Sequence, residues 1–118
     1  MAGIHSRNFD APDESRTPDK TRVDVVHLAG TDVARLTLQP GWRWSECIKP
    51  VAQTESCQAD HVGYVAAGHL VVEHEDGSRA TLSPGEAYRI APGHDAWVEG
   101  EEAFVGFEFQ SAAEYARG

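Results

Sequence analysis

The sequence lacks the features that mark membrane, secreted or disulfide-rich proteins. It contains two cysteines, Cys47 and Cys57, and one methionine among 118 residues. No apolar run approaches the roughly 20 residues that a membrane helix needs, and the first residues lack the apolar core of a secretory signal. We therefore expect no membrane association and a cytoplasmic location. There, two cysteines are more often free thiols or metal ligands than a disulfide.

Positive charge is also scarce. Ten lysines and arginines stand against nineteen aspartates and glutamates, which gives a net charge of −9 at pH 7. Such a chain repels a phosphate backbone, and no cluster of basic residues reverses this locally. The sequence therefore predicts that the protein does not bind nucleic acid.

The length is enough for one domain with one core. Residues 1–21 are polar and charged, and we interpret them as an N-terminal arm that is partly ordered, with Ile4 and Phe9 available as anchors. Residues 22–110 form the predicted domain. Residues 111–118 are predicted to be a short C-terminal helix or tail, because Ser111 can cap a helix with Glu114 three residues on.

From residue 22 onward the apolar residues alternate with a period of two, which is typical of half-buried strands. Turns containing Gly, Pro or Asp separate the runs, and Asp76-Gly77 is the strongest hairpin signal. Short strands are predicted over 23–27, 34–38, 61–66, 69–74, 79–82, 87–90, 96–98 and 103–110. Many short strands without a long helix indicate an all-β antiparallel sandwich or closed barrel.

Two segments combine tight turns with residues that can bind metals. In the first, Pro40 to Gly68, Cys47, Cys57 and His61 occur. In the second, Gly85 to Trp97, a strand leads to the turn Pro92-Gly93 and then directly to His94. Two such segments predict a small β-barrel with a site at its mouth.

The spacing of glycine and proline in these two segments resembles that of a small single-domain cupin. The resemblance covers Val33 to Phe109. The first cupin motif runs Gly, five residues, His-x-His, three or four residues, Glu, six residues, Gly. The second runs Gly, five residues, Pro-x-Gly, two residues, His, three residues, Asn. This resemblance implies a double-stranded β-helix, also called a jelly-roll barrel.

The first motif fits in two registers. Counting from Gly41 puts Cys47 at the first histidine position, and counting back from Gly68 puts His61 at the glutamate position. Keeping the short spacing from His61 instead puts Cys57 at the second histidine position. The exact count from Gly41 favours Cys47, but both alternatives stay open.

The second motif keeps its glycines and changes its ligand. The expected histidine position after Gly85 and Gly93 falls on Ala96, and His94 comes two residues earlier. Because alternate residues of a strand share a face, His94 would point the same way from a place shifted by roughly 6–7 Å along the strand. His94 is therefore the predicted substitute ligand.

The resemblance and the chemistry together predict a metal site of His61, His94 and one thiolate, from Cys47 or Cys57. Histidine and cysteine bind zinc, iron, nickel or manganese rather than magnesium or calcium, and three protein ligands leave a position open. Aromatic residues near the two motifs would wall an apolar ligand pocket. These are Trp42, Trp44, Tyr88 and Trp97.

We expect a cupin that binds a divalent metal and a small organic molecule in the barrel. If it is an enzyme, the resemblance implies oxygenase-, isomerase- or cyclase-type chemistry, in which the metal activates the substrate. The alternative is a metal-free cupin that acts as a binding or regulatory module. The resemblance also implies a homodimer, in which the arm at 1–21 contributes to pairing.

Overall fold

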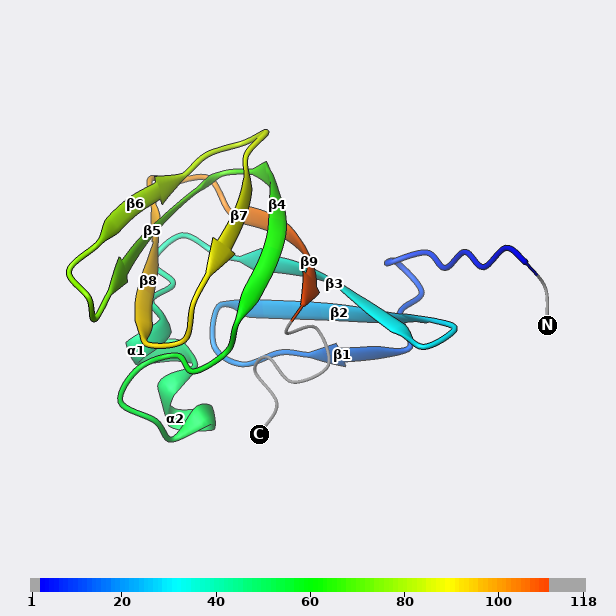
Figure 1. Cartoon of the computed structure of the whole chain (residues 1–118), viewed down its shortest axis with the longest axis horizontal. Coiled ribbons are helices and arrows are strands. Elements are labelled where there is room, and N and C mark those ends of the chain that lie inside the picture. The colour runs from blue at the N-terminus through cyan, green and yellow to red at the C-terminus, as the bar shows by residue number, and fades with distance from the viewer. Residues whose placement is uncertain (1–2, 111–118) are drawn as a thin grey trace.

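Two antiparallel sheets face each other across the core in the computed structural model, which describes residues 3–110 (Figure 1). The larger sheet has the strand order β1-β2-β3-β9-β4-β7, and the smaller has the order β6-β5-β8. The strands are β1 (Glu14–Arg16), β2 (Thr21–Leu28), β3 (Thr31–Leu38), β4 (His61–Ala67), β5 (His69–His74), β6 (Arg79–Leu82), β7 (Ala87–Ile90), β8 (His94–Glu99) and β9 (Phe104–Gln110).

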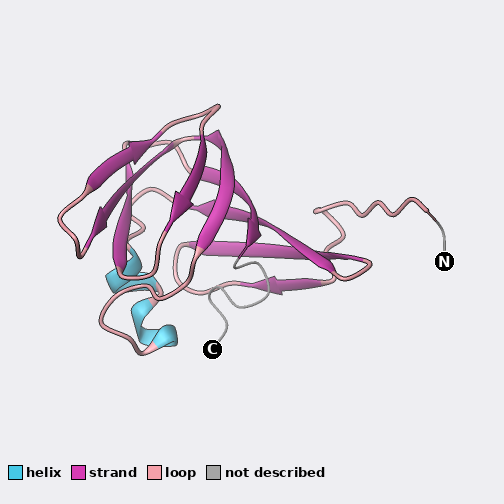
Figure 2. Cartoon of the chain, viewed as in Figure 1, coloured by secondary structure: helices cyan, strands magenta, loops and turns pink. Residues whose placement is uncertain are grey.

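This architecture confirms the predicted all-β barrel, and each predicted strand is present with similar bounds. Between β3 and β4 lie two single-turn helices, α1 (Trp44–Cys47) and α2 (Lys49–Ala52), which occupy the stretch without alternation (Figure 2). The helix predicted over 111–118 lies outside the described residues.

Local chain chemistry explains the turns between the strands. At the Asp76-Gly77 turn, Gly77 has a φ of +93° and its N–H donates to the His74 carbonyl at 3.0 Å. The β2–β3 turn uses Ala29 and Gly30, both with positive φ, so that Leu28 pairs with Thr31.

The inner surfaces of the sheets form the core. On β9, a charged side chain points into this core, where an apolar one is usual. Its buried face carries Phe104, Gly106 and the charged Glu108, whereas Phe107 is half-buried and Phe109 is 56% exposed. An apolar strand therefore turns its acidic side chain inward. The core that this carboxylate enters must supply it with hydrogen-bond donors.

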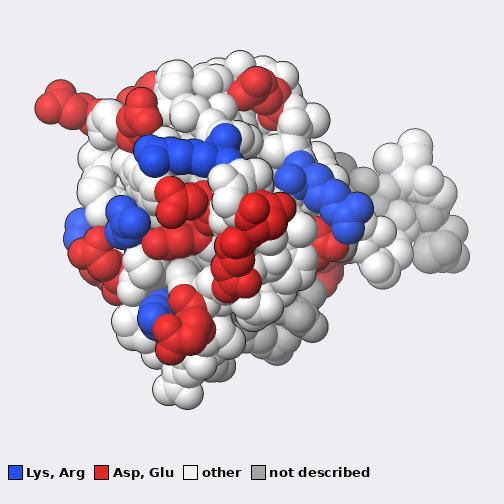
Figure 3. Space-filling model, turned by 60° about the vertical axis from the view of Figure 1, so that its left-hand side comes forward, with Lys and Arg blue, Asp and Glu red and all other residues white. Residues whose placement is uncertain are grey.

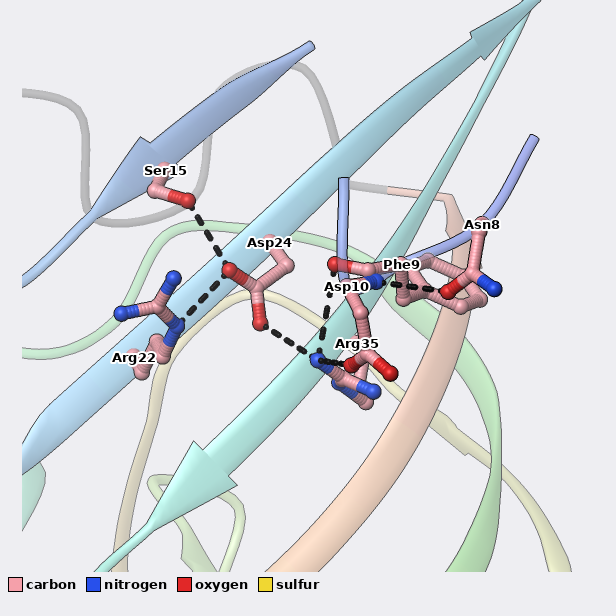
Figure 4. A network of polar contacts seen from close by, with 7 residues as sticks. All are labelled: Asn8, Phe9, Asp10, Ser15, Arg22, Asp24 and Arg35. Atoms are coloured by element: carbon pink, nitrogen blue, oxygen red, sulfur yellow. Dashed lines mark hydrogen bonds and ion pairs between the residues drawn. The ribbon is translucent and has the colours of Figure 1, made fainter. Parts of the chain in front are cut away.

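The arm covers part of the outer face of the larger sheet. Its Phe9 ring lies 5.3 Å from that of Phe107, and β1 pairs with β2. The Asp24 carboxylate is fully buried under this arm. It accepts hydrogen bonds from Ser15 Oγ at 2.9 Å and Arg22 Nε at 2.9 Å, and from Arg35 Nη2 at 3.1 Å (Figure 4).

Of the two anchors expected in the arm, Phe9 packs on the body, and Ile4 does not. The Ile4 side chain is 88% exposed. The N-terminal part of the arm extends away from the sheets (Figure 1). Further along the same outer face, Tyr64 and Phe109 are exposed as well. Homodimer formation stays a prediction.

The surface reflects the acidic composition. On the face drawn in Figure 3, lysine and arginine side chains lie in small groups with acidic side chains close beside them. Among the described residues, the helices are too short to cross a membrane. The absence of nucleic-acid binding stays a prediction.

Candidate metal centre

A thiol and two imidazoles meet inside the barrel. Cys57, His61 and His94 each place one ligand atom within 4.8 Å of the others, and all three side chains are buried. The distance between Cys57 Sγ and His61 Nε2 is 3.5 Å. His61 and His94 are the first residues of β4 and β8, so two strand ends supply the imidazoles.

Backbone hydrogen bonds bring Cys57 to His94. The Cys57 N–H donates to the His94 carbonyl at 2.8 Å, and the Gly93 N–H donates to the Cys57 carbonyl at 2.7 Å. Cys57 and His94 therefore form an isolated antiparallel bridge outside the sheets. This bridge fixes the thiol beside a residue 37 positions away in the chain (94 − 57).

Each imidazole is held through its Nδ1 atom. His61 Nδ1 lies 2.6 Å from Glu108 Oε1, and His94 Nδ1 lies 2.8 Å from the Ala91 carbonyl oxygen. A carbonyl or carboxylate partner makes Nδ1 the protonated nitrogen and leaves Nε2 as the ligand atom. Carboxylates and carbonyls are also the usual partners of metal-binding histidines.

Glu108 is itself held by Tyr88, whose hydroxyl donates to Oε2 at 2.6 Å. Two glycines make room for this phenol. A Cβ at Gly63 would lie 2.7 Å from the Tyr88 hydroxyl oxygen, and one at Gly106 would lie 3.1 Å from it. Glycine at these two positions is what allows Tyr88 to reach the carboxylate.

The separation of the Cys57 and His61 ligand atoms matches that in a tetrahedral transition-metal site. Zinc with a Zn–S bond of about 2.3 Å and a Zn–N bond of about 2.0 Å holds these two atoms about 3.5 Å apart. That is the Cys57–His61 separation in the structure, 3.5 Å. Only three protein ligands converge among the described residues, which is the pattern of a site that keeps an open position.

The electrostatics of the cluster favour the thiolate that metals require. Burial raises the pKa of Cys57, but hydrogen bonds and charges from His61 and His94 outweigh burial and lower it to about 6. Burial lowers the pKa of His61, but Glu108 and Cys57 outweigh burial and raise it to about 10. Without a metal, the site therefore holds a thiolate beside an imidazolium at neutral pH.

A small cavity of about 20 Å³ adjoins the cluster. This exceeds the ~10–15 Å³ that one water molecule needs. His61, His94 and Glu108 line it on the polar side, and the remaining walls are largely apolar. Those walls are Leu36, Leu38, Trp42, Trp44, Leu70, Ile90, Ala96 and Phe104.

The four predicted pocket aromatics divide into three groups. Trp42 and Trp44 line the cavity. Tyr88 acts behind it through Glu108. Trp97 lies on the other face of β8 from His94 and Ala96, where its ring contacts the guanidinium groups of Arg43 at 4.4 Å and Arg79 at 5.1 Å.

The two predicted cysteines also separate. Cys57 joins the histidines, whereas Cys47 lies at the end of α1 with its Sγ 3.8 Å from Asp19 Oδ2. Both are buried free thiols. The register that favoured Cys47 is therefore not the one that brings a thiol to His61 and His94.

Sequence reasoning missed Glu108. The signal available was an acidic residue between Phe107 and Phe109 that shares a strand face with Gly106. Whether that face points inward depends on the pairing of β9 with β3 and β4, which alternation alone does not reveal.

No family model and no curated protein matches this sequence. Solved structures do resemble it. A protein of unknown function from Rhizobium leguminosarum has a TM-score of 0.65 at 21% identity, covering 91% of this chain and 95% of its own. A sugar phosphate isomerase of the cupin superfamily from Silicibacter pomeroyi has a TM-score of 0.62 at 17% identity, covering 88% and 73%.

A cupin domain from Bordetella pertussis has a TM-score of 0.52 at 19% identity, covering 80% of this chain and 95% of its own. These likenesses extend over most of the described barrel. The chain therefore has the cupin fold, as the two glycine-spaced motifs predicted.

Proposed function

We propose that this cupin binds a divalent transition metal through Cys57, His61 and His94, with a small organic ligand in the barrel. The observation that supports the proposal most is the convergence of three buried ligand atoms within 4.8 Å. Burying a thiol and two imidazoles together costs desolvation free energy, which a purely structural core would avoid by using apolar residues.

Each residue has a defined part in this proposal. The Cys57 thiolate and the Nε2 atoms of both histidines are the ligands. Glu108 and the Ala91 carbonyl orient the two rings through Nδ1, and Tyr88 orients Glu108. A metal held there would act as a Lewis acid toward a ligand oxygen or a bound water.

Zinc or iron suits this set best among the metals considered, because thiolate and imidazole are their preferred ligands. Nickel and manganese are the other candidates. For the reaction class, the Silicibacter neighbour is named a sugar phosphate isomerase. Isomerisation is therefore the first chemistry to assay, ahead of oxygenase or cyclase chemistry.

Metal content of protein purified without an affinity tag tests the proposal. We expect close to one metal ion per chain in the wild type, and loss of the ion in His61→Ala and His94→Ala. The two buried cysteines provide a matched pair, in which Cys57→Ser loses metal and Cys47→Ser keeps it. A metal-free wild type, or metal retained in both histidine variants, would contradict the proposal.

A second candidate is a metal-free binding or regulatory module. The observation that favours it is that Cys57 Sγ and His61 Nε2 lie 3.5 Å apart, so the thiol and the imidazole can hydrogen-bond to each other without an ion. In that case, the protein would contain no metal and its melting temperature would still rise with a small molecule that fits the cavity.

A further inference from the structure

A second hollow of the molecule lies outside the candidate metal centre, where β6 and β7 separate. These strands follow each other in the chain, but each is the edge strand of a different sheet, so they do not pair with each other. Figure 1 shows them diverging from the turn that joins them. Residues of both strands line a pocket of about 290 Å³, which we call the seam pocket. Cys57, His61 and His94 do not line it.

The inner face of β6 is left uncovered at the seam pocket. Ala80 pairs with Val72 and Leu82 pairs with Leu70, and paired residues of antiparallel strands share a face of the sheet. Val72 and Leu70 are buried core residues, whereas Ala80 is exposed and Leu82 is half-buried. Apolar side chains on the core-facing side of β6 are therefore open to the seam pocket.

The two arginines that line the seam pocket are paired with acidic residues. Arg89 Nη2 lies 2.9 Å from Asp60 Oδ2, and Arg79 Nη1 lies 3.6 Å from Glu73 Oε2. The guanidinium of Arg79 also lies 5.1 Å from the centre of the Trp97 ring. Both guanidinium groups are thus engaged by neighbours of the protein itself.

The polar residues at the β5–β6 turn are satisfied in the same way. Asp76 Oδ1 accepts from the N–H of Ser78 at 2.8 Å and from its hydroxyl at 2.5 Å. His74 Nδ1 accepts from the Asp76 N–H at 3.0 Å, and His74 Nε2 lies 2.8 Å from the Pro92 carbonyl oxygen. The seam pocket therefore offers apolar walls, and its charged residues already have partners.

Ile90 connects the seam pocket to the candidate metal centre. It is 8% exposed, and it lines both the seam pocket and the cavity of about 20 Å³ beside His61 and His94. It also pairs with His61 across β7 and β4. A group held in the seam pocket would therefore contact a residue that neighbours the imidazole of His61.

We propose that the seam pocket binds an uncharged, apolar part of a small organic molecule. Its volume is close to the lower end of the roughly 300–1,000 Å³ of small-molecule sites, and burial of apolar surface favours binding. That this molecule is also the ligand of the metal centre rests on the proposed function. A second copy of the chain covering the seam is the alternative occupant, which the experiment separates.

The test is a benzyl alcohol titration of protein labelled with ¹³C at the δ1 methyl groups of its three isoleucines. We expect the Ile90 signal, assigned with Ile90→Val, to shift and saturate. The signals of Ile48, 1% exposed in the core, and Ile4, 88% exposed, should stay in place. Benzoate has the same ring with a negative charge, and it should bind roughly tenfold more weakly or worse, because its desolvation is not compensated.

Neighbouring residues of β6 supply a matched pair of variants. Ala80 and Thr81 are both exposed, and of the two only Ala80 lines the seam pocket. Ala80→Glu should weaken benzyl alcohol binding roughly tenfold or more, because the bound ring would desolvate the new carboxylate. Thr81→Glu adds the same charge on the other face of the strand and should change the affinity by less than about twofold.

The outcomes separate this inference from the proposed function. An Ile90 signal that does not saturate, benzoate binding as tight as that of benzyl alcohol, or equal affinity in Ala80→Glu and Thr81→Glu overturns the inference. An Ile90 shift on dilution of the protein alone would mean that a second copy covers the seam, and it also overturns the inference. Zinc per chain, measured separately, tests the proposed function. Saturation at Ile90 in protein that binds no zinc supports the seam pocket and rejects only its link to a metal.

Discussion

His61 on β4 and Glu108 on β9 share a hydrogen bond of 2.6 Å inside the barrel. Both side chains are almost fully buried, and Tyr88 holds the second oxygen of the carboxylate. The pair links the candidate ligand set to the larger sheet.

Glu108→Gln should weaken metal binding without removing it. The amide keeps the shape of the side chain and removes its charge, so His61 Nδ1–H loses its anionic partner. Changes of this kind beyond the ligands typically cost about 10- to 100-fold in metal affinity. Competition with a chelator of known affinity measures the loss.

Tyr88→Phe is the control for this experiment. It removes only the hydroxyl that supports Glu108, so its effect on affinity should be smaller than that of Glu108→Gln. Equal affinity in Glu108→Gln and the wild type would show that the carboxylate has no part in metal binding.

The Cys57 thiol should ionise early in metal-free protein. Burial opposes ionisation, but His61 and His94 lower the pKa of the thiol to about 6, from an ordinary value of about 8.5. The thiol is therefore protonated below about pH 6 and a thiolate above it. Thiolate ultraviolet absorbance against pH gives the midpoint, and Cys57→Ser supplies the blank that contains only Cys47.

His61→Gln should move this midpoint upward, because the hydrogen bond and the positive charge of the imidazolium are lost. A midpoint that stays put in His61→Gln would mean that His61 does not set the thiol pKa. A wild-type midpoint near the ordinary value would contradict the thiolate altogether.

Gly63→Ala should destabilise the barrel. The new Cβ would lie 2.6 Å from the Phe107 carbonyl oxygen and 2.7 Å from the Tyr88 hydroxyl oxygen. Overpacking of this kind costs about 1–3 kcal/mol in the free energy of unfolding, which urea denaturation measures. Tyr88→Phe removes the hydroxyl oxygen but leaves the ring carbon Cζ at 2.8 Å from the new Cβ, so most of the cost of Gly63→Ala should remain in the double variant. A free energy of unfolding for Gly63→Ala equal to that of the wild type would contradict this prediction.

Asp24→Ala should also destabilise the protein, by about 1–3 kcal/mol, because Ser15, Arg22 and Arg35 each lose a hydrogen bond to the buried carboxylate. Asp24 is fully buried and contacts both Arg22 and Arg35, whereas Asp10 contacts the same Arg35 from an exposed position. Asp10→Ala is thus the matched control, with an expected change within about 0.5 kcal/mol. Equal changes in the free energy of unfolding for Asp24→Ala and Asp10→Ala would show that the buried carboxylate adds no more stability than the exposed one.

Local chemistry explains how much of the fold could be predicted. Alternation in 61–66 and 69–74, and turns such as Asp76-Gly77, depend on residues close together in the chain. The cupin-like spacing of Gly85 and Gly93 is likewise a matter of turn residues close together in the chain. The face of β9 could not be predicted, because apolar Phe107 and Phe109 point outward and Glu108 points inward.

The choice of thiol shows the same limit at the site. Counting from Gly41 favoured Cys47, but the chain between the two cysteines forms α2 and a loop that returns to His94. The partner of Cys57 is thus set by a backbone bridge between distant segments. No spacing rule within one segment contains that information.

The sequence by itself determined an acidic, all-β cupin barrel and named His61 and His94, because periodicity and turn residues act over a few positions. Only the tertiary structure decided that Cys57 joins them, that Glu108 and Tyr88 stand behind His61, and that Trp44 Nε1 has no acceptor among the described residues. Each of these depends on which strands become neighbours. Burial favours pairing of polar groups within the shared interior, as His61, Glu108 and Tyr88 show.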